Sequence, residues 1–323
     1  MNFSSVKVVE LLVVFIVEFI FLFFFVRFLI GFLKSKNAVQ HVREELIDEH
    51  KKKEGTPRGG GIAFLVAPLF ILPFFHSKEV LFVVISLFIF GLIGLIDDIL
   101  TFRKKSSEGL PIRYKLIIYT FASILLYFIF RDIFTPTLCF FGLKFSVSYI
   151  VYFALFLVMM LGSTNAFNLT DGVDGLLGSV TSIMLFVFIF IALLNNHIPI
   201  AAVSISLLIS ILAFLWFNAP KASIFMGDLG SGALGGVIAA IAIIEKVELY
   251  LPIIAIIPVI EALSIFIQVS YFKITHGKRI FKMSPIHHHF EILGWSEAQV
   301  DFRFSAITVI AGIIAILLML LSL

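Results

Sequence analysis

Two adjacent carboxylates, Asp97 and Asp98, end an apolar segment that reads GLIGLIDDIL. Acids at a membrane boundary are costly unless they are hydrated, paired or bound to a metal, and the helix dipole disfavours them at a C-terminal end. Two solvated acids at the end of a helix would be the purely structural interpretation. We favour a functional one, in which the carboxylates hold a cation or move a proton.

A second polar group lies in NAFNLTDGVDGL, between two apolar segments. Asn165, Asn168, Thr170, Asp171 and Asp174 supply amide, hydroxyl and carboxylate oxygens within ten residues. These are hard donors of the kind that Mg²⁺ or a sugar binds. A capped turn, with the last acid starting the next helix, would explain only part of this pattern.

The third candidate is Asp228, in the Gly-rich segment FMGDLGSGALGG that begins at Phe225. The N-terminus of the helix that follows could hold a phosphate. The segment is not a Walker A loop, because no Gly-Lys-Ser/Thr follows. We interpret Gly235 and Gly236 as a helix-packing face and Asp228 as functional.

Three consecutive imidazoles, His287, His288 and His289, occur in SPIHHHFE. Consecutive side chains do not converge on one point, which argues against a zinc site made of these three alone. Imidazoles can instead bind a pyrophosphate or shuttle a proton near neutral pH.

Three further residues accompany these motifs. Lys115 begins an apolar segment close in sequence to the Asp pair, where it could neutralise phosphate or serve as a membrane anchor. Glu261 and Gln268 are seven residues apart on one face of a later segment, and such polar groups usually face the interior of a helix bundle.

The elements that must position these residues are membrane helices. Of the 323 residues, 60% are hydrophobic and 14% charged, with a mean hydropathy of +1.11, far from the composition of a soluble domain. The net charge of +3 gives no case for nucleic-acid binding. The chain is expected to be one all-α domain over 1–323, and its ten predicted spans are 8–33, 61–75, 80–99, 115–131, 147–162, 176–194, 199–217, 232–244, 249–272 and 304–322.

Basic residues predict the orientation of these spans. Alternate loops divide into two sets, and one set contains 18 of the 24 Lys and Arg residues. By the positive-inside rule this set is cytoplasmic, and both termini face outward. All the polar motifs then lie on the cytoplasmic side. The outer loop 132–147 is expected to be either a small hairpin or an irregular loop.

The motifs GLIDD, NAFNLTDGVDGL, FMGDLGSG and PIHHHFE, in this order and spacing, resemble the phospho-N-acetylmuramoyl-pentapeptide transferases. These belong to the polyprenyl-phosphate N-acetylhexosamine-1-phosphate transferases. The resemblance covers nearly the whole chain. It implies a ten-helix, Mg²⁺-dependent enzyme of the bacterial plasma membrane, a homodimer with a cytoplasmic active site. Such an enzyme moves a sugar phosphate from UDP-MurNAc-pentapeptide to undecaprenyl phosphate, giving lipid I and UMP.

The resemblance and the chemistry of the side chains together suggest roles. Asp228 is expected to bind Mg²⁺, Asp98 to be a second ligand or to position the acceptor, and Asp97 to be the base. A nucleophilic Asp that forms a phospho-enzyme is an open alternative. Lys115 would bind phosphate, and the three His residues would bind pyrophosphate or the lactyl-peptide arm of the sugar. The residues expected to bind uridine or sugar are Asn165, Asn168, Asp171, Asp174 and Phe225. Gln268 is a further expected substrate-binding residue.

The chain departs from the family at two points. The Lys that often follows the Asp pair by three residues is Thr101 here, and the usual Pro-Thr-Met-Gly-Gly reads Pro57-Arg58-Gly59-Gly60. Both changes affect expected phosphate contacts rather than the class of reaction.

Two other functions fit parts of the pattern. A sister transferase would use UDP-N-acetylglucosamine, although the His run favours the muramoyl donor. An ion-coupled transporter would also place acids among Gly-interrupted spans. A transporter, however, needs its polar groups near the middle of the bilayer, and here they gather at one face.

Overall fold

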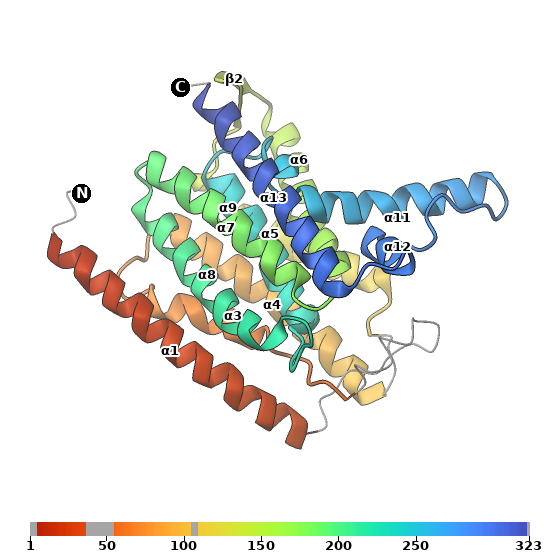
Figure 1. Cartoon of the computed structure of the whole chain (residues 1–323). Coiled ribbons are helices and arrows are strands. Elements are labelled where there is room, and N and C mark those ends of the chain that lie inside the picture. The colour runs from red at the N-terminus through yellow and green to blue at the C-terminus, as the bar shows by residue number, and fades with distance from the viewer. Residues whose placement is uncertain (1–4, 37–54, 105–108, 322–323) are drawn as a thin grey trace.

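The computed structural model describes residues 5–36, 55–104 and 109–321 and is almost entirely α-helical. Within these ranges, nine helices are long and apolar enough to cross a membrane, and most of them pack side by side as a bundle (Figure 1). They are α1 (Ser5–Ser35), α4 (Lys78–Lys104), α5 (Ile112–Ile129), α6 (Tyr149–Thr170), α7 (Leu176–Leu194), α8 (Ile198–Asn218), α9 (Gly227–Ile244), α11 (Ile256–Ile274) and α13 (Glu297–Leu320).

Nine of the ten predicted spans correspond to these helices, and the span predicted at 61–75 does not form one long helix. It consists of the short helix α3 (Ile62–Val66) followed by the 3-10 turn η1 (Ala67–Phe70), which contains Pro68. A proline in the interior of a helix removes a backbone hydrogen bond, and the α-helix accordingly stops there. Figure 1 shows this segment running back beside α8 toward the start of α4.

The centre of the bundle is α9, in which almost every residue is buried. It packs closely against α4 because small residues allow the two backbones to approach each other. A Cβ atom built on Gly94 of α4 would lie 2.0 Å from the carbonyl oxygen of Asp228, and one on Gly235 would lie 2.6 Å from the Cα of Thr164 in α6. The prediction that Gly235 and Gly236 pack against other helices is confirmed.

Gly94→Ala is therefore expected to destabilise the protein by about 3 kcal/mol, because an added methyl group would meet backbone that cannot move aside. The matched control is Gly162→Ala in α6, where nothing lies within 4 Å of the added Cβ. The measurement is the thermal unfolding midpoint of each variant in detergent. Equal midpoints for the two variants would contradict the close α4–α9 contact.

Smaller elements complete the fold. The predicted hairpin is present, with β1 (Thr137–Phe140) antiparallel to β2 (Leu143–Ser146). A short helix, α10 (Leu251–Ile254), precedes α11, which extends away from the rest of the bundle (Figure 1). Beneath it lies α12 (Ile286–Ile292), which carries the three histidines.

Candidate functional site

The polar motifs meet at one end of the bundle. Asp97 and Asp98 lie near the C-terminal end of α4, and Asn168 near that of α6, whereas Lys115 and Asp228 lie in the first turns of α5 and α9. Helices that run in opposite directions bring these ends together. The convergence predicted from the sequence is confirmed for these five residues.

Asp98 is buried and serves as a cap for α9. Its two carboxylate oxygens accept hydrogen bonds from the backbone N–H groups of Asp228, at 3.1 Å, and Leu229, at 3.0 Å. A carboxylate is favourable at this position because the first N–H groups of a helix lack partners and its N-terminus carries partial positive charge. Asp98 thus holds the first turn of α9, which carries Asp228, in place.

Asp228 lies between two cations and an amide. Its Oδ1 accepts hydrogen bonds from Nη2 of Arg58 at 2.6 Å and from Nδ2 of Asn168 at 3.0 Å. Its Oδ2 accepts from Nζ of Lys115 at 2.5 Å. Charge-assisted hydrogen bonds of this kind are strong in a low-dielectric site, so the carboxylate is held in one orientation.

Asp97 shares Lys115 with Asp228. Its Oδ2 lies 3.3 Å from the Lys115 ammonium, and its Oδ1 accepts from the backbone N–H of Leu110 at 2.5 Å. Thr101, where the family often has a Lys, instead donates its hydroxyl hydrogen to the Asp97 carbonyl at 2.9 Å. Position 101 therefore supplies no positive charge to Asp97 and Asp98.

Arg58 supplies a cation that was not among the predicted site residues. Its Nε lies 2.7 Å from Oδ1 of Asp98 while Nη2 binds Asp228. Burial alone would lower the pKa of the Arg58 guanidinium, but the carboxylates of Asp98 and Asp228 outweigh this and hold that pKa above its usual value. The departure from the family motif at Pro57-Arg58 was the signal in the sequence that could have identified it.

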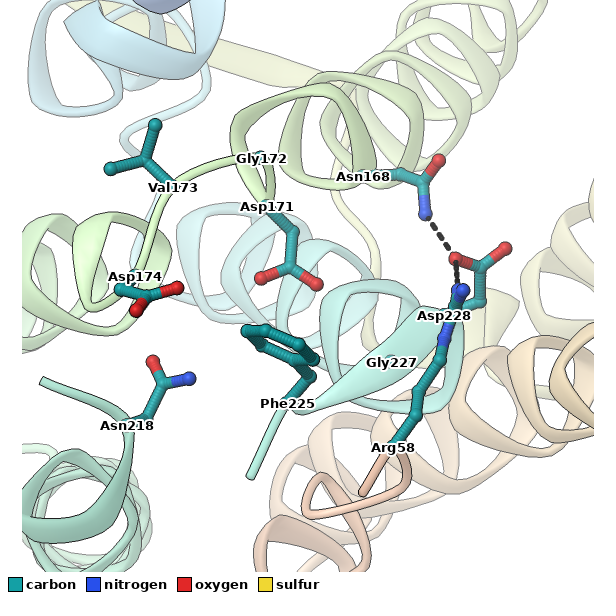
Figure 2. Close-up of a pocket in the computed structure, with 10 residues that line it drawn as sticks. All are labelled: Arg58, Asn168, Asp171, Gly172, Val173, Asp174, Asn218, Phe225, Gly227 and Asp228. Carbon is teal, nitrogen blue, oxygen red and sulfur yellow. Dashed lines mark hydrogen bonds and ion pairs between the residues drawn. The ribbon is translucent and has the colours of Figure 1, made fainter. Parts of the chain in front are cut away.

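A pocket opens beside Asp228 (Figure 2). Burial raises the pKa of Asp171 in its wall well above the usual value, and the nearby Arg58 opposes this. Asp174 accepts a hydrogen bond from the backbone N–H of Ala222 at 2.8 Å. Five of the residues around the pocket are predicted site residues. The full set is Arg58, Asn168, Asp171, Gly172, Val173, Asp174, Asn218, Phe225, Gly227 and Asp228.

His287 is buried against the loop that carries Asp171. A Cβ atom built on Gly172 would lie 2.3 Å from Nε2 of His287, so only glycine lets the ring approach. On the other side, Nδ1 of His287 lies 3.1 Å from Oε1 of Glu261. The other oxygen of Glu261 accepts the backbone N–H of Ile286 at 2.8 Å. Glu261 thus holds the start of α12 and places a carboxylate oxygen beside the imidazole, although this oxygen and Nδ1 do not form a hydrogen bond in good geometry.

We expect Glu261→Gln to raise the KM for the nucleotide donor about tenfold, since it removes the charge that faces His287. The amide oxygen can still accept from Ile286, so the unfolding midpoint should change little. Glu245→Gln is the matched control, because Glu245 lies 3.1 Å from Nδ1 of His197 at the opposite end of α9. Equal kinetics in both variants would contradict a positioning role for Glu261.

The other two histidines have different polar partners, although the His288 ring lies next to that of His287, with ring centroids 4.1 Å apart. Nδ1 of His288 lies 2.7 Å from Oε2 of Glu291, and Nδ1 of His289 accepts the backbone N–H of Lys282 at 3.1 Å. The prediction that the three rings cannot point the same way is confirmed.

Two predicted substrate-binding residues use their side chains locally in this structure. Asn165 donates to the carbonyl of Leu161 at 2.8 Å, one turn back in its own helix, and is not in the pocket wall. Gln268 accepts the N–H groups of Ile280 and Phe281 at 3.1 and 3.0 Å and so secures the loop after α11.

The donor set suits a magnesium ion chemically. Asp97 and Asp228 offer hard carboxylate oxygens on either side of Lys115, the kind of ligand that Mg²⁺ prefers. Among the described residues, no three His, Cys, Asp or Glu side chains already form a metal-binding group. The two cations at these acids would have to shift as a metal binds.

Comparison with known proteins agrees with this geometry. The model of the family described as glycosyl transferase family 4 matches residues 80–246, which include both the Asp pair and Asp228. Proteins named phospho-N-acetylmuramoyl-pentapeptide-transferase are similar over most of their length. The relative from Dictyoglomus thermophilum is 41% identical, covering 84% of this chain and 86% of its own.

Two further relatives of the same name come from other bacteria. The one from Clostridium botulinum is 43% identical over 85% of this chain and 86% of its own. The one from Enterococcus faecalis is 39% identical, over 87% of this chain and 90% of its own. Identity at this level over this length, with the acids brought together as the motifs predict, places the chain in glycosyl transferase family 4, among the phospho-N-acetylmuramoyl-pentapeptide transferases.

Proposed function

We propose that this protein transfers phospho-N-acetylmuramoyl-pentapeptide from UDP-MurNAc-pentapeptide to undecaprenyl phosphate, which gives lipid I and UMP for peptidoglycan synthesis. A phosphate oxygen of the lipid forms a bond to the phosphorus that carries the sugar. The bond from that phosphorus to the oxygen bridging the two phosphates breaks, and UMP leaves with the bridging oxygen. The transferase family supplies the reaction class.

One observation supports the proposal above the others: three carboxylates and two cations are concentrated at one end of an otherwise apolar bundle, beside a pocket. Asp97, Asp98 and Asp228 contact Arg58 and Lys115 directly. Phosphoryl transfer between two anions requires such an arrangement, because the repulsion between the substrates must be offset.

Each side chain has a task in this reaction. Asp97 accepts the proton of the acceptor phosphate, and Lys115 stabilises negative charge on the transferring phosphoryl group. Asp228 would hold Mg²⁺, with Asp98 fixing its helix. Mg²⁺, when bound, neutralises phosphate charge. Asp171 and Phe225, in the pocket wall, would contact the uridine or the sugar.

The proposal extends to the setting of the enzyme. The basic loops favour a site on the cytoplasmic face of a bacterial plasma membrane, which is where a soluble nucleotide donor is available. The acceptor tail would lie in the bilayer beside α11, whose outer face is exposed and apolar. The family resemblance favours a homodimer.

The test is release of UMP from the purified protein with undecaprenyl phosphate and either UDP-MurNAc-pentapeptide or UDP-GlcNAc. We expect UMP from the muramoyl donor alone, lost with chelator and restored by Mg²⁺. UMP from UDP-GlcNAc would assign the protein to the sister activity. Undiminished release after complete removal of divalent ions would contradict the role given to Asp228.

A further inference from the structure

We propose that Arg58 is a binding residue for the diphosphate of the nucleotide donor, and that it exchanges its ion pairs with the acids for phosphate oxygens when the donor binds. This inference rests on the proposed function and deepens it. It assigns a substrate contact to a residue at which the chain departs from its family.

The first argument is access to the pocket. Arg58 is part of the pocket wall, together with Phe225 and Asp171, whereas Lys115 is not among the residues that line it. Figure 2 shows the Arg58 side chain running along the wall with its head at Asp228. Of the two cations that contact the acids, Arg58 is the one that lines this pocket.

The second argument is that the backbone of Arg58 is fixed while its side chain can move. Arg58 forms a parallel bridge with Phe225. The N–H of Phe225 donates to the Pro57 carbonyl at 2.8 Å, and the N–H of Gly59 donates to the Phe225 carbonyl at 3.0 Å. The long side chain therefore begins from a defined point of the wall and can redirect its guanidinium by rotation about its own bonds.

The third argument is that the acids keep other partners if Arg58 leaves. Both oxygens of Asp98 accept backbone N–H groups of α9. Asp228 keeps Lys115 and Asn168. The Nε–H of Arg58 is buried without a hydrogen bond in good geometry, although Oδ1 of Asp98 is only 2.7 Å away. The guanidinium is thus attracted by charge but incompletely matched.

The fourth argument is chemical complementarity. The planar guanidinium presents its N–H groups as a fork that fits two phosphate oxygens at once, which a carboxylate pair split between two residues does not offer. A diphosphate also brings at least two negative charges to a site whose acids already exceed its cations by one. A cation that can turn toward the ligand removes much of that repulsion.

The experiment compares the affinities of the full-length protein for UDP and for uridine by titration calorimetry in detergent. Arg58→Gln should weaken UDP binding about 10- to 100-fold, the range for a lost charge-assisted contact. Uridine has no phosphate, so its affinity should change less than twofold. Arg58→Lys should lie between, because Lys restores the charge without the fork. Lys78→Gln, which removes a cation paired with Asp132 away from the pocket, is the control.

Two results would overturn the inference. One is unchanged UDP affinity in a folded Arg58→Gln protein. The other is an equal loss of UDP and uridine affinity with a lowered unfolding midpoint, which would make Arg58 a counter-ion of the acids only. A wild-type protein that binds UDP but releases no UMP from the muramoyl donor would contradict the proposed function and leave the Arg58 comparison intact.

Discussion

Asp228→Asn is expected to lower UMP release about a thousandfold, the upper range for removing one preorganised electrostatic contact, while the protein stays folded. The carboxylate contacts Arg58, Lys115 and Asn168 at 2.5 to 3.0 Å. Asparagine has the same shape but no charge. The site would then contain two acids and two cations instead of three acids and two cations. The substitution therefore leaves no excess charge that would destabilise the fold.

Three measurements make this prediction specific. UMP release gives the activity, the thermal unfolding midpoint gives the stability, and Mn²⁺ binding followed by electron paramagnetic resonance reports the metal site without turnover. Asp132→Asn, at an exposed acid paired with Lys78, controls for the loss of one carboxylate. Near-normal turnover, or unchanged Mn²⁺ affinity, would exclude Asp228 as the metal ligand.

The location of the site could be predicted because it follows from where motifs fall relative to apolar segments. Asp97 and Asp98 lie near the end of one helix and Asp228 lies in the first turn of another, and antiparallel packing alternates such ends between two sides. The sequence also marks how close the helices come, since Gly94 and Gly235 leave room for neighbouring backbone. These features depend on order and spacing, which the sequence contains directly.

What could not be predicted depends on side-chain direction. Asn165 and Asn168 are three residues apart, yet one bonds to its own helix and the other to Asp228. The backbone bridge to Phe225 brings Arg58 to the acids, and its position in a basic loop does not indicate that contact. Asn168 and Arg58 lie 60 and 170 residues from Asp228 in the sequence, so these contacts depend on how distant helices pack.

The two adjacent acids should differ sharply when each is replaced by Asn. Asp98 holds two backbone N–H groups of α9, whereas Asp97 holds one N–H group, that of Leu110, and shares Lys115. An asparagine offers a single acceptor oxygen. At position 97 this oxygen suffices for Leu110, but at position 98 one helix N–H is left without a partner.

Asp98→Asn is therefore expected to reduce the free energy of unfolding by about 1–3 kcal/mol, the penalty for an unsatisfied buried donor, in addition to losing activity. Asp97→Asn should change stability by less than about 1 kcal/mol, because Lys115 keeps its contact with Asp228. Thermal or denaturant unfolding of both variants in the same detergent tests the difference. Equal destabilisation would contradict the capping role of Asp98.

The pH dependence of Asp97→Asn then separates a base from a purely electrostatic group. The second ionisation of a phosphate monoester has a pKa of about 6. Below that pH the acceptor carries a proton that a base must remove, and the variant should be slower by about a hundredfold. Above it the phosphate is already a dianion, so the defect should shrink steadily as the pH rises toward 8. A defect of constant size from pH 5.5 to 8 would assign Asp97 to charge or metal binding and leave the reaction without a side-chain base at this position.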